Sequence, residues 1–264
     1  MLLFLAFEGA LDYNGKNGGK GREAVIWAVI ALGCIAAGIV QAVTGFGSVV
    51  FMMLVFPFFF DMIDAPALAL VVNQLYCMAL LWKYRHHIQW RIVLPPTILY
   101  TIGNFVVAQF VGGLDLRVLT IAFAVFLMAL SVYFLLVARR IKVKPHPAVG
   151  VGVGIFSGIT GGLFAIGGPP VALYMVSATD DYKSYRGCMQ FLFTVTGIGN
   201  LAGRFFGGVL HAEILPYAAV GTVCILLGAL VGNRIVSRLN ADTFRLAVYL
   251  FVGISGVILL LQNI

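Results

Sequence analysis

The chain has 264 residues, of which 61% are hydrophobic and 10% charged, and its mean hydropathy is +1.03. Soluble domains carry roughly 25% charged residues, so this composition excludes a soluble globular protein and indicates a chain that crosses a membrane repeatedly. There is room for about eight spans of roughly 20 residues and no soluble domain beside them. The net charge of +7 would suggest nucleic-acid binding in a soluble chain. Here it indicates cytoplasmic loops, where lysine and arginine accumulate, so we expect a lipid bilayer and no nucleic acid as partner.

The first membrane element is too long to be one straight span. Residues 1–23 are predicted to form an N-terminal tail, and residues 24–60 then run without a charge. A straight helix of that length would measure about 55 Å against a hydrocarbon core of about 30 Å. We expect it to tilt, fold back or break, with the break centred on Thr44-Gly45-Phe46-Gly47-Ser48. Three ordinary spans are predicted after it, at about 65–82, 93–111 and 118–138.

A second long element follows the basic linker at 139–147. Residues 150–177 contain eight glycines and then Pro169 and Pro170. Glycine weakens a helix by about 1 kcal/mol and proline by about 3 kcal/mol, and a proline disfavours helical dihedrals at the residue before it, here Gly168. The stretch is therefore predicted to be bent or broken. Three more spans are expected, at about 187–204, 214–233 and 245–262.

This order of one long and three short elements occurs twice, which predicts an internal duplication. GIVQAVTG at 38–45 aligns with GIFSGITG at 154–161, and Leu94-Pro95 aligns with Leu215-Pro216. The fold class expected is an all-α polytopic membrane protein with two homologous halves, each containing a broken or re-entrant element and three transmembrane helices. The repeats are predicted at 24–138 and 148–264, joined by a cytoplasmic linker at 139–147.

The loop charges indicate that the two halves have opposite orientations. The loop 83–91 holds Lys83, Arg85 and Arg91, whereas the matching loop 205–213 has no lysine or arginine. Basic loops face the cytoplasm, so the halves are predicted to form an inverted repeat. Lys16, Lys20 and Arg22 argue against this arrangement, because it places them outside.

The two breaks are candidate binding sites. A broken helix exposes backbone polar groups that must face protein or a cavity at membrane depth, and half-helix N-termini attract anions. The alternative is close packing of two long tilted helices. The candidate residues at the breaks are Thr44, Gly45, Gly47, Ser48, Thr160, Gly161, Gly162, Gly167 and Gly168.

The span 187–204 carries a polar face that could line an anion pathway. Gln190, Thr194, Gly197 and Arg204 lie within about 80° on a helical wheel, with Asn200 about 40° beyond. The alternative is that Arg204 extends to the lipid headgroups while the polar residues bond neighbouring helices. Asn73 is a further candidate because it lies in the middle of a span.

The sequence offers little support for other chemistries. No Asp or Glu lies in the middle of a predicted span, which disfavours a carboxylate-based proton or sodium relay. No nucleophile–base pair or metal-spaced cluster is evident, so we expect neither an enzyme nor a cofactor or metal. The four cysteines lie in apolar runs and are interpreted as buried small residues.

At the two glycine-rich segments the chain resembles the TauE/SafE family of sulfite exporters and organosulfonate permeases. The resemblance rests on GIVQAVTGFGSVVFMMLVFPFF at 38–59, GIFSGITGGLFAIGGPPVALYM at 154–175 and KYRHHIQW at 83–90. Phe46 and Ser48 stand where many members carry glycine. The resemblance implies an inner-membrane secondary transporter of a small sulfur-containing anion, such as sulfite, sulfoacetate or a related organosulfonate, working by alternating access. A passive anion channel of the same architecture is the alternative, and a homodimer is left open.

Overall fold

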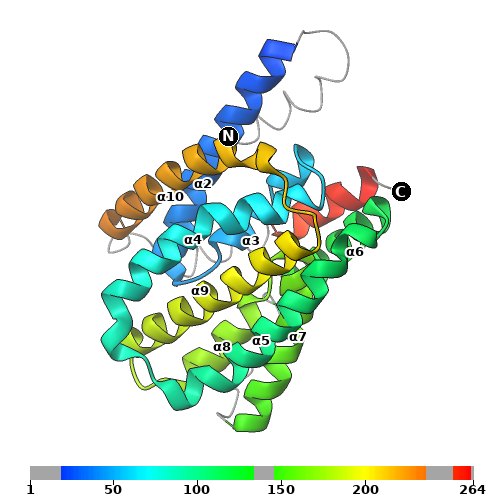
Figure 1. Cartoon of the computed structure of the whole chain (residues 1–264). Coiled ribbons are helices and arrows are strands. Elements are labelled where there is room, and N and C mark those ends of the chain that lie inside the picture. The colour runs from blue at the N-terminus through cyan, green and yellow to red at the C-terminus, as the bar shows by residue number, and fades with distance from the viewer. Residues whose placement is uncertain (1–18, 134–145, 236–251, 263–264) are drawn as a thin grey trace.

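The computed structural model describes residues 19–133, 146–235 and 252–262. These residues are almost entirely helical and include no strand, which confirms the all-α membrane fold (Figure 1). The first part of the predicted tail, most of the basic linker and the beginning of the last predicted span lie outside the described residues. α2 begins at Gly19, inside the segment that the sequence assigned to the tail.

Both long elements are broken helices, as predicted. Residues 19–53 form α2 and α3 on either side of a short break, and residues 147–178 form α7 and α8 in the same way. The helices are α2 (Gly19–Thr44), α3 (Ser48–Met53), α4 (Asp64–Tyr84), α5 (Trp90–Phe110), α6 (Leu116–Val132), α7 (Pro147–Phe164), α8 (Gly168–Ala178), α9 (Tyr182–Phe206) and α10 (Leu215–Ile235), and residues 252–262 are also helical. Short 3-10 turns lie at Phe56–Phe58, Arg85–His87, Val111–Gly113 and Ala212–Ile214.

Within the described residues, four helical segments are long and apolar enough to cross a membrane: 23–44, 64–87, 90–113 and 212–234. α9 does not meet this description although it has 25 residues, enough for about 37 Å at 1.5 Å per residue. Its polar face lowers its hydropathy, and that face is buried inside the protein. Polar residues on the buried face of a membrane helix are typical of a helix that lines a substrate pathway or that binds neighbouring helices through hydrogen bonds.

α9 lies at the centre of the bundle (Figure 1). It packs against α4 and α5, while α5 also packs against α7, and α2 packs against α10. Glycines permit the closest approaches: a Cβ on Gly103 of α5 would meet the Gly158 Cα of α7 at 3.2 Å, and one on Gly228 of α10 would overlap the backbone of Ile35 in α2. Small residues at such crossings are the usual means of packing helices in membranes.

Contacts between the elements place the two ends of α9. At its beginning, a Cβ on Gly187 would lie 2.9 Å from the Tyr84 carbonyl oxygen, beside the turn between α4 and α5. At its end, Arg204 reaches the Ile63 carbonyl, directly before α4. The beginning of α9 therefore lies beside the basic loop 83–91, and its end lies beside the start of α4.

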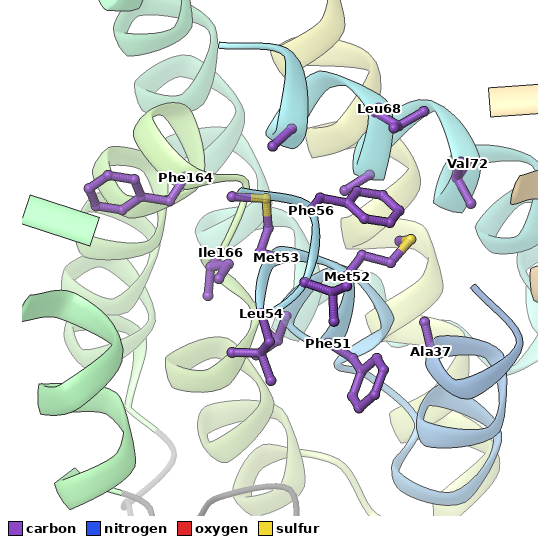
Figure 2. Packing of buried hydrophobic residues seen from close by; sticks show 14 of the residues in the cluster. Ala37, Phe51, Met52, Met53, Leu54, Phe56, Leu68, Val72, Phe164 and Ile166 are labelled. Carbon is purple, nitrogen blue, oxygen red and sulfur yellow. The ribbon is translucent and has the colours of Figure 1, made fainter. Parts of the chain in front are cut away.

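The short helix α3 anchors the first break in the apolar core. Met52, Met53 and Leu54 are at most 1% exposed. They belong to the same buried cluster as Phe164, the last residue of α7, and Ile166, which lies in the second break (Figure 2). The two broken elements thus share one packed core although they are more than a hundred residues apart in the sequence.

The structure changes the alignment of the two halves. In the sequence match, Gly154 is aligned with Gly38, an offset of 116 positions. The first break begins at Gly45 and the second at Ala165, an offset of 120 positions. The motif match is therefore out of register with the breaks by about one helical turn. The inverted repeat stays a prediction.

Candidate functional site

The first break is made by two glycines in left-handed conformations. Gly45 has φ 87° and Gly47 has φ 98°, a region that residues with a Cβ rarely adopt. The Thr44 hydroxyl lies 2.8 Å from the Val40 carbonyl oxygen and also contacts the Phe46 carbonyl oxygen, and its one proton bonds to one of them at a time. The break lies where the sequence predicted it.

The second break is made by Ala165, Ile166 and Gly167. Ala165 has φ 60°, and its N–H donates to the Gly161 carbonyl at 2.8 Å. Gly168, expected to be non-helical, is instead the first residue of α8, followed by Pro169 and Pro170 in the first turn. This is a favourable place for proline, since the first N–H groups of a helix have no intrahelical acceptor. The prolines also remove two backbone donors that the sequence analysis had expected at this helix end.

Both breaks contribute to the wall of one cavity of about 40 Å³. At roughly 10–15 Å³ for each water, a cavity of this size holds about three. No ionisable acid or base lines it apart from the phenol of Tyr100. The lining residues are Gln41, Gly47, Ser48, Val49, Val50, Leu70, Asn73, Gln74, Tyr100, Asn104, Ala165, Ile166, Gly168, Phe193, Thr196 and Gly197.

A group of neutral polar side chains lies on the wall nearest the first break. The Ser48 hydroxyl lies 2.7 Å from Asn73 Oδ1 and also contacts Gln41 Oε1. One hydroxyl proton serves only one of these oxygens, and a half-turn of either amide would exchange its oxygen for its NH2 group. The same three side chains can therefore offer donors or acceptors to a bound solute.

α9 holds the C-terminal ends of both half-helices with two pairs of side chains. Arg186 Nη1 donates to the Gln41 carbonyl at 3.1 Å, and Gln190 Nε2 donates to the Gly45 carbonyl at 3.2 Å. These carbonyls lie at the end of α2 and in the break that follows it. The negative end of that half-helix is thereby occupied by a cation and an amide donor.

The second pair repeats this arrangement at the other end of α9. Asn200 Nδ2 donates to the Gly161 carbonyl at 2.8 Å, and Arg204 Nη2 donates to the Gly162 carbonyl at 3.4 Å, in the last turn of α7. Arg186 and Arg204 are 18 residues apart, which is five turns and about 27 Å along one face of the helix. A single helix therefore caps both breaks.

The comparisons with known proteins agree with this architecture. The family model described as "Sulfite exporter TauE/SafE" matches residues 29–259. The chain belongs to this family. A curated relative, the "Probable sulfite/organosulfonate exporter TauE" of Cupriavidus necator, is 27% identical over 183 residues, covering 66% of this chain and 70% of the relative. No solved structure gives a significant match. Membership in TauE/SafE makes the chain a multi-pass membrane transporter and not an enzyme.

The predicted site residues of this TauE/SafE chain divide into two groups. Gly47, Ser48, Asn73 and Gly168 line the cavity. The others are not among its lining residues, and several of them shape the breaks or bond to them: Thr44, Gly45, Thr160, Gly161, Gly162, Gly167, Gln190, Thr194, Asn200 and Arg204.

Arg204 has a different place from the one expected. It is fully buried, and its guanidinium also donates to Asn200 Oδ1 at 2.8 Å and to the Ile63 carbonyl at 2.9 Å. The donors that the sequence assigned to a substrate are used on the protein itself. Because Arg204 is fully buried, it also does not extend to the lipid headgroups, which was the alternative.

Sequence reasoning missed several residues of the site. Gln41, Tyr100, Asn104 and Thr196 line the cavity and were not among the candidates. Arg186 was missed because the span was started at residue 187, whereas α9 begins at Tyr182. Extending the polar face of Gln190 by one turn toward the N-terminus would have found it, since residues four apart share a helix face.

Proposed function

We propose that this protein carries a small sulfur-containing anion, such as sulfite, sulfoacetate or a related organosulfonate, across the inner membrane by alternating access. The cavity between the two breaks is the substrate site in this proposal. Ser48, Asn73 and the first turn of α8 at Gly168 are the groups that contact the substrate.

The observation that carries the proposal is the joint contribution of both breaks to one cavity. Gly47 and Ser48 come from the first break, and Ala165 and Gly168 come from the second. Secondary transporters bind substrates between discontinuous helices, and movement of one such element against the other opens the site to alternate sides. Two breaks that only allowed tight helix packing would need no shared polar space.

The electrostatics of the site favour an anion. None of the described residues that line the cavity carries a carboxylate, and α9 donors occupy carbonyls at the negative ends of α2 and α7. The N-terminal end of α8, which reaches the cavity at Gly168, carries a partial positive charge. With the negative ends neutralised and that positive end exposed, the local field attracts negative charge.

The chemical class of the anion is supported by the relative in Cupriavidus necator, whose name describes it as a probable sulfite or organosulfonate exporter. Sulfite and sulfonates have oxygens that accept hydrogen bonds from backbone N–H groups, hydroxyls and amides. The neutral donors of the cavity are of this kind. The direction of transport is not part of the proposal.

The function is tested with purified protein in liposomes. Sulfite uptake should saturate with concentration, and liposomes preloaded with unlabelled sulfite should accelerate entry of labelled sulfite. Saturation and counterflow are expected of an alternating-access carrier. Unsaturated flux without counterflow would replace the carrier by a passive anion channel, and the absence of any sulfur oxyanion flux would refute the proposal.

A pair of glycine substitutions ties the flux to the cavity. Gly168→Leu inserts a side chain where Cβ would already lie 3.1 Å from the Phe193 ring, at the cavity wall. Gly152→Leu makes the same change in α7 at a position with no atom within 4 Å. We expect Gly168→Leu to abolish sulfite flux and Gly152→Leu to retain it. Normal flux in both variants would remove the cavity from the transport route.

A further inference from the structure

Arg186 differs from Arg204 in how its charge is satisfied. Its side chain is only 3% exposed, and no carboxylate in the described part of the chain forms a salt bridge with it. Its Nη1 bonds to the Gln41 carbonyl, but its Nε is buried and has no hydrogen-bond partner among the described residues. Arg204, in contrast, uses Nε and both terminal nitrogens.

A second unsatisfied polar group lies on the helix packed against this part of α9. The Tyr76 hydroxyl is buried without a hydrogen-bond partner in the described residues, and Tyr76 lies on α4, which packs against α9. The rings of Tyr84 and Tyr182 lie 5.9 Å and 5.5 Å from the guanidinium carbon. Tyr182 is itself 58% exposed, so the guanidinium lies beside a side chain on the outside of the described structure.

These groups share one chemical requirement. A buried cation without a counter-charge is costly, and so is each buried donor without an acceptor. The guanidinium Nε–H and the Tyr76 O–H are both donors, and the aromatic faces also favour positive charge. A small oxyanion supplies the missing negative charge and several acceptor oxygens, and guanidinium binds such groups with paired hydrogen bonds.

We propose that Arg186 and Tyr76 form a second binding site for a small sulfur oxyanion, between the first break and the basic loop 83–91. This inference rests on the proposed function for the identity of the anion. Arg186 bonds the backbone of Gln41, whose side chain lines the cavity, and the next residue, Gly187, packs against the Tyr84 carbonyl. The proposed site therefore lies between the basic loop and the cavity and is separate from the cavity.

Thermal melting of the purified protein in detergent, titrated with sulfite, tests the site. A ligand that binds the folded form raises the melting temperature, and the concentration dependence gives an apparent Kd. Arg186→Gln should raise this Kd by at least about tenfold, and Tyr76→Phe by about three- to tenfold, because each loses a hydrogen bond to the anion. The control Arg85→Gln removes the same charge from an exposed position in the basic loop, and its Kd should stay at the wild-type value.

The melting temperature without sulfite separates binding from folding. Removal of an unsatisfied buried hydroxyl should leave Tyr76→Phe at least as stable as the wild type, while its response to sulfite is weakened. A wild-type sulfite response in Tyr76→Phe overturns the proposal, and this holds even if Arg186→Gln does not fold. Equal weakening in Arg186→Gln and Arg85→Gln would also overturn it, since only the general field of the loop would then matter.

Two further arms identify the ligand and separate this inference from the proposed function. A stabilisation given by phosphatidylglycerol but not by sulfite would assign the site to a lipid headgroup and overturn the proposal. If sulfite flux occurs in liposomes but the Kd measured by thermal melting does not depend on Arg186, this site is refuted and the transport function stands. If sulfite binding depends on Arg186 but no sulfite flux occurs, the transport function is refuted and this site stands.

Discussion

Replacement of Arg204 by glutamine tests whether this residue supports the fold or binds substrate. The guanidinium bonds to Asn200 Oδ1 at 2.8 Å, to the Ile63 carbonyl at 2.9 Å and to the Gly162 carbonyl at 3.4 Å. It thereby joins the end of α9 to the last turn of α7 and to the turn before α4. Glutamine is shorter and uncharged, so it cannot make the three contacts together.

The loss can be estimated from these contacts. A hydrogen bond to a charged group contributes about 1.5–3 kcal/mol, and two of the three bonds are shorter than 3.0 Å. Their sum is about 3–6 kcal/mol, and relief of the buried charge offsets part of it, so we expect a loss of about 3 kcal/mol. Because Arg204 does not line the cavity, the KM for sulfite of the folded variant should stay within about twofold.

The assay is reversible denaturant unfolding in detergent, followed by tryptophan fluorescence, with sulfite flux measured on the folded protein in liposomes. Arg234→Gln is the matched control, since it removes a charge from an exposed position near the end of α10 and should change stability by no more than about 0.5 kcal/mol. If Arg204→Gln were as stable as this control but had a much higher KM, the reasoning would be refuted and Arg204 would be a substrate ligand.

Two further predictions concern the second break and the surface. Gly167→Ala places a Cβ against a backbone carbonyl and a buried hydroxyl, and it should lower the free energy of unfolding by about 1–3 kcal/mol. The control Gly152→Ala places its Cβ in open space within α7 and should raise the free energy of unfolding by about 0.5–1 kcal/mol. Equal melting temperatures of the two variants would contradict the described packing. A hydrogen bond to Asp64, 2.8 Å away, raises the pKa of the exposed His211 above its usual value of 6.5. The pair therefore stabilises the folded protein below pH 6.5, and this stabilisation is lost as the pH rises through the pKa that His211 has in the folded protein. The melting-temperature difference between wild type and Asp64→Asn should therefore shrink with rising pH, more than for Glu213→Gln, and parallel curves would exclude the pair.

The two breaks show how far local sequence determines this fold. In the first, Gly45 and Gly47 lie two residues apart beside Thr44 and Ser48, and both adopt the left-handed conformation that glycine permits. In the second, eight glycines offered many positions for the break, and the left-handed residue is Ala165. Glycines such as Gly158 serve the contact with α5 instead. A glycine pattern does not distinguish conformational freedom from close packing, because both need the absence of a Cβ.

The site was predicted in part for a related reason. Ser48 was identified because it lies at the predicted first break, and Asn73 because a polar residue in the middle of a span must face protein. Both line the cavity. The partner of His211 could not be identified in the same way, because it is Asp64, on a different helix, and not the neighbouring Glu213. Contacts between distant segments depend on how the helices pack, and that packing is not encoded in any short stretch.

The amino-acid sequence alone determined that this chain is a membrane protein of TauE/SafE type with two interrupted elements, because hydropathy, glycine and proline act locally on the backbone. Only the tertiary structure decided which polar groups meet. It placed both interruptions on one cavity, used Arg204 to hold helix ends and left Arg186 buried without a counter-charge among the described residues. The physical reason is that the environment of a charge is set by the groups packed around it, and here those groups come from helices far apart in the chain.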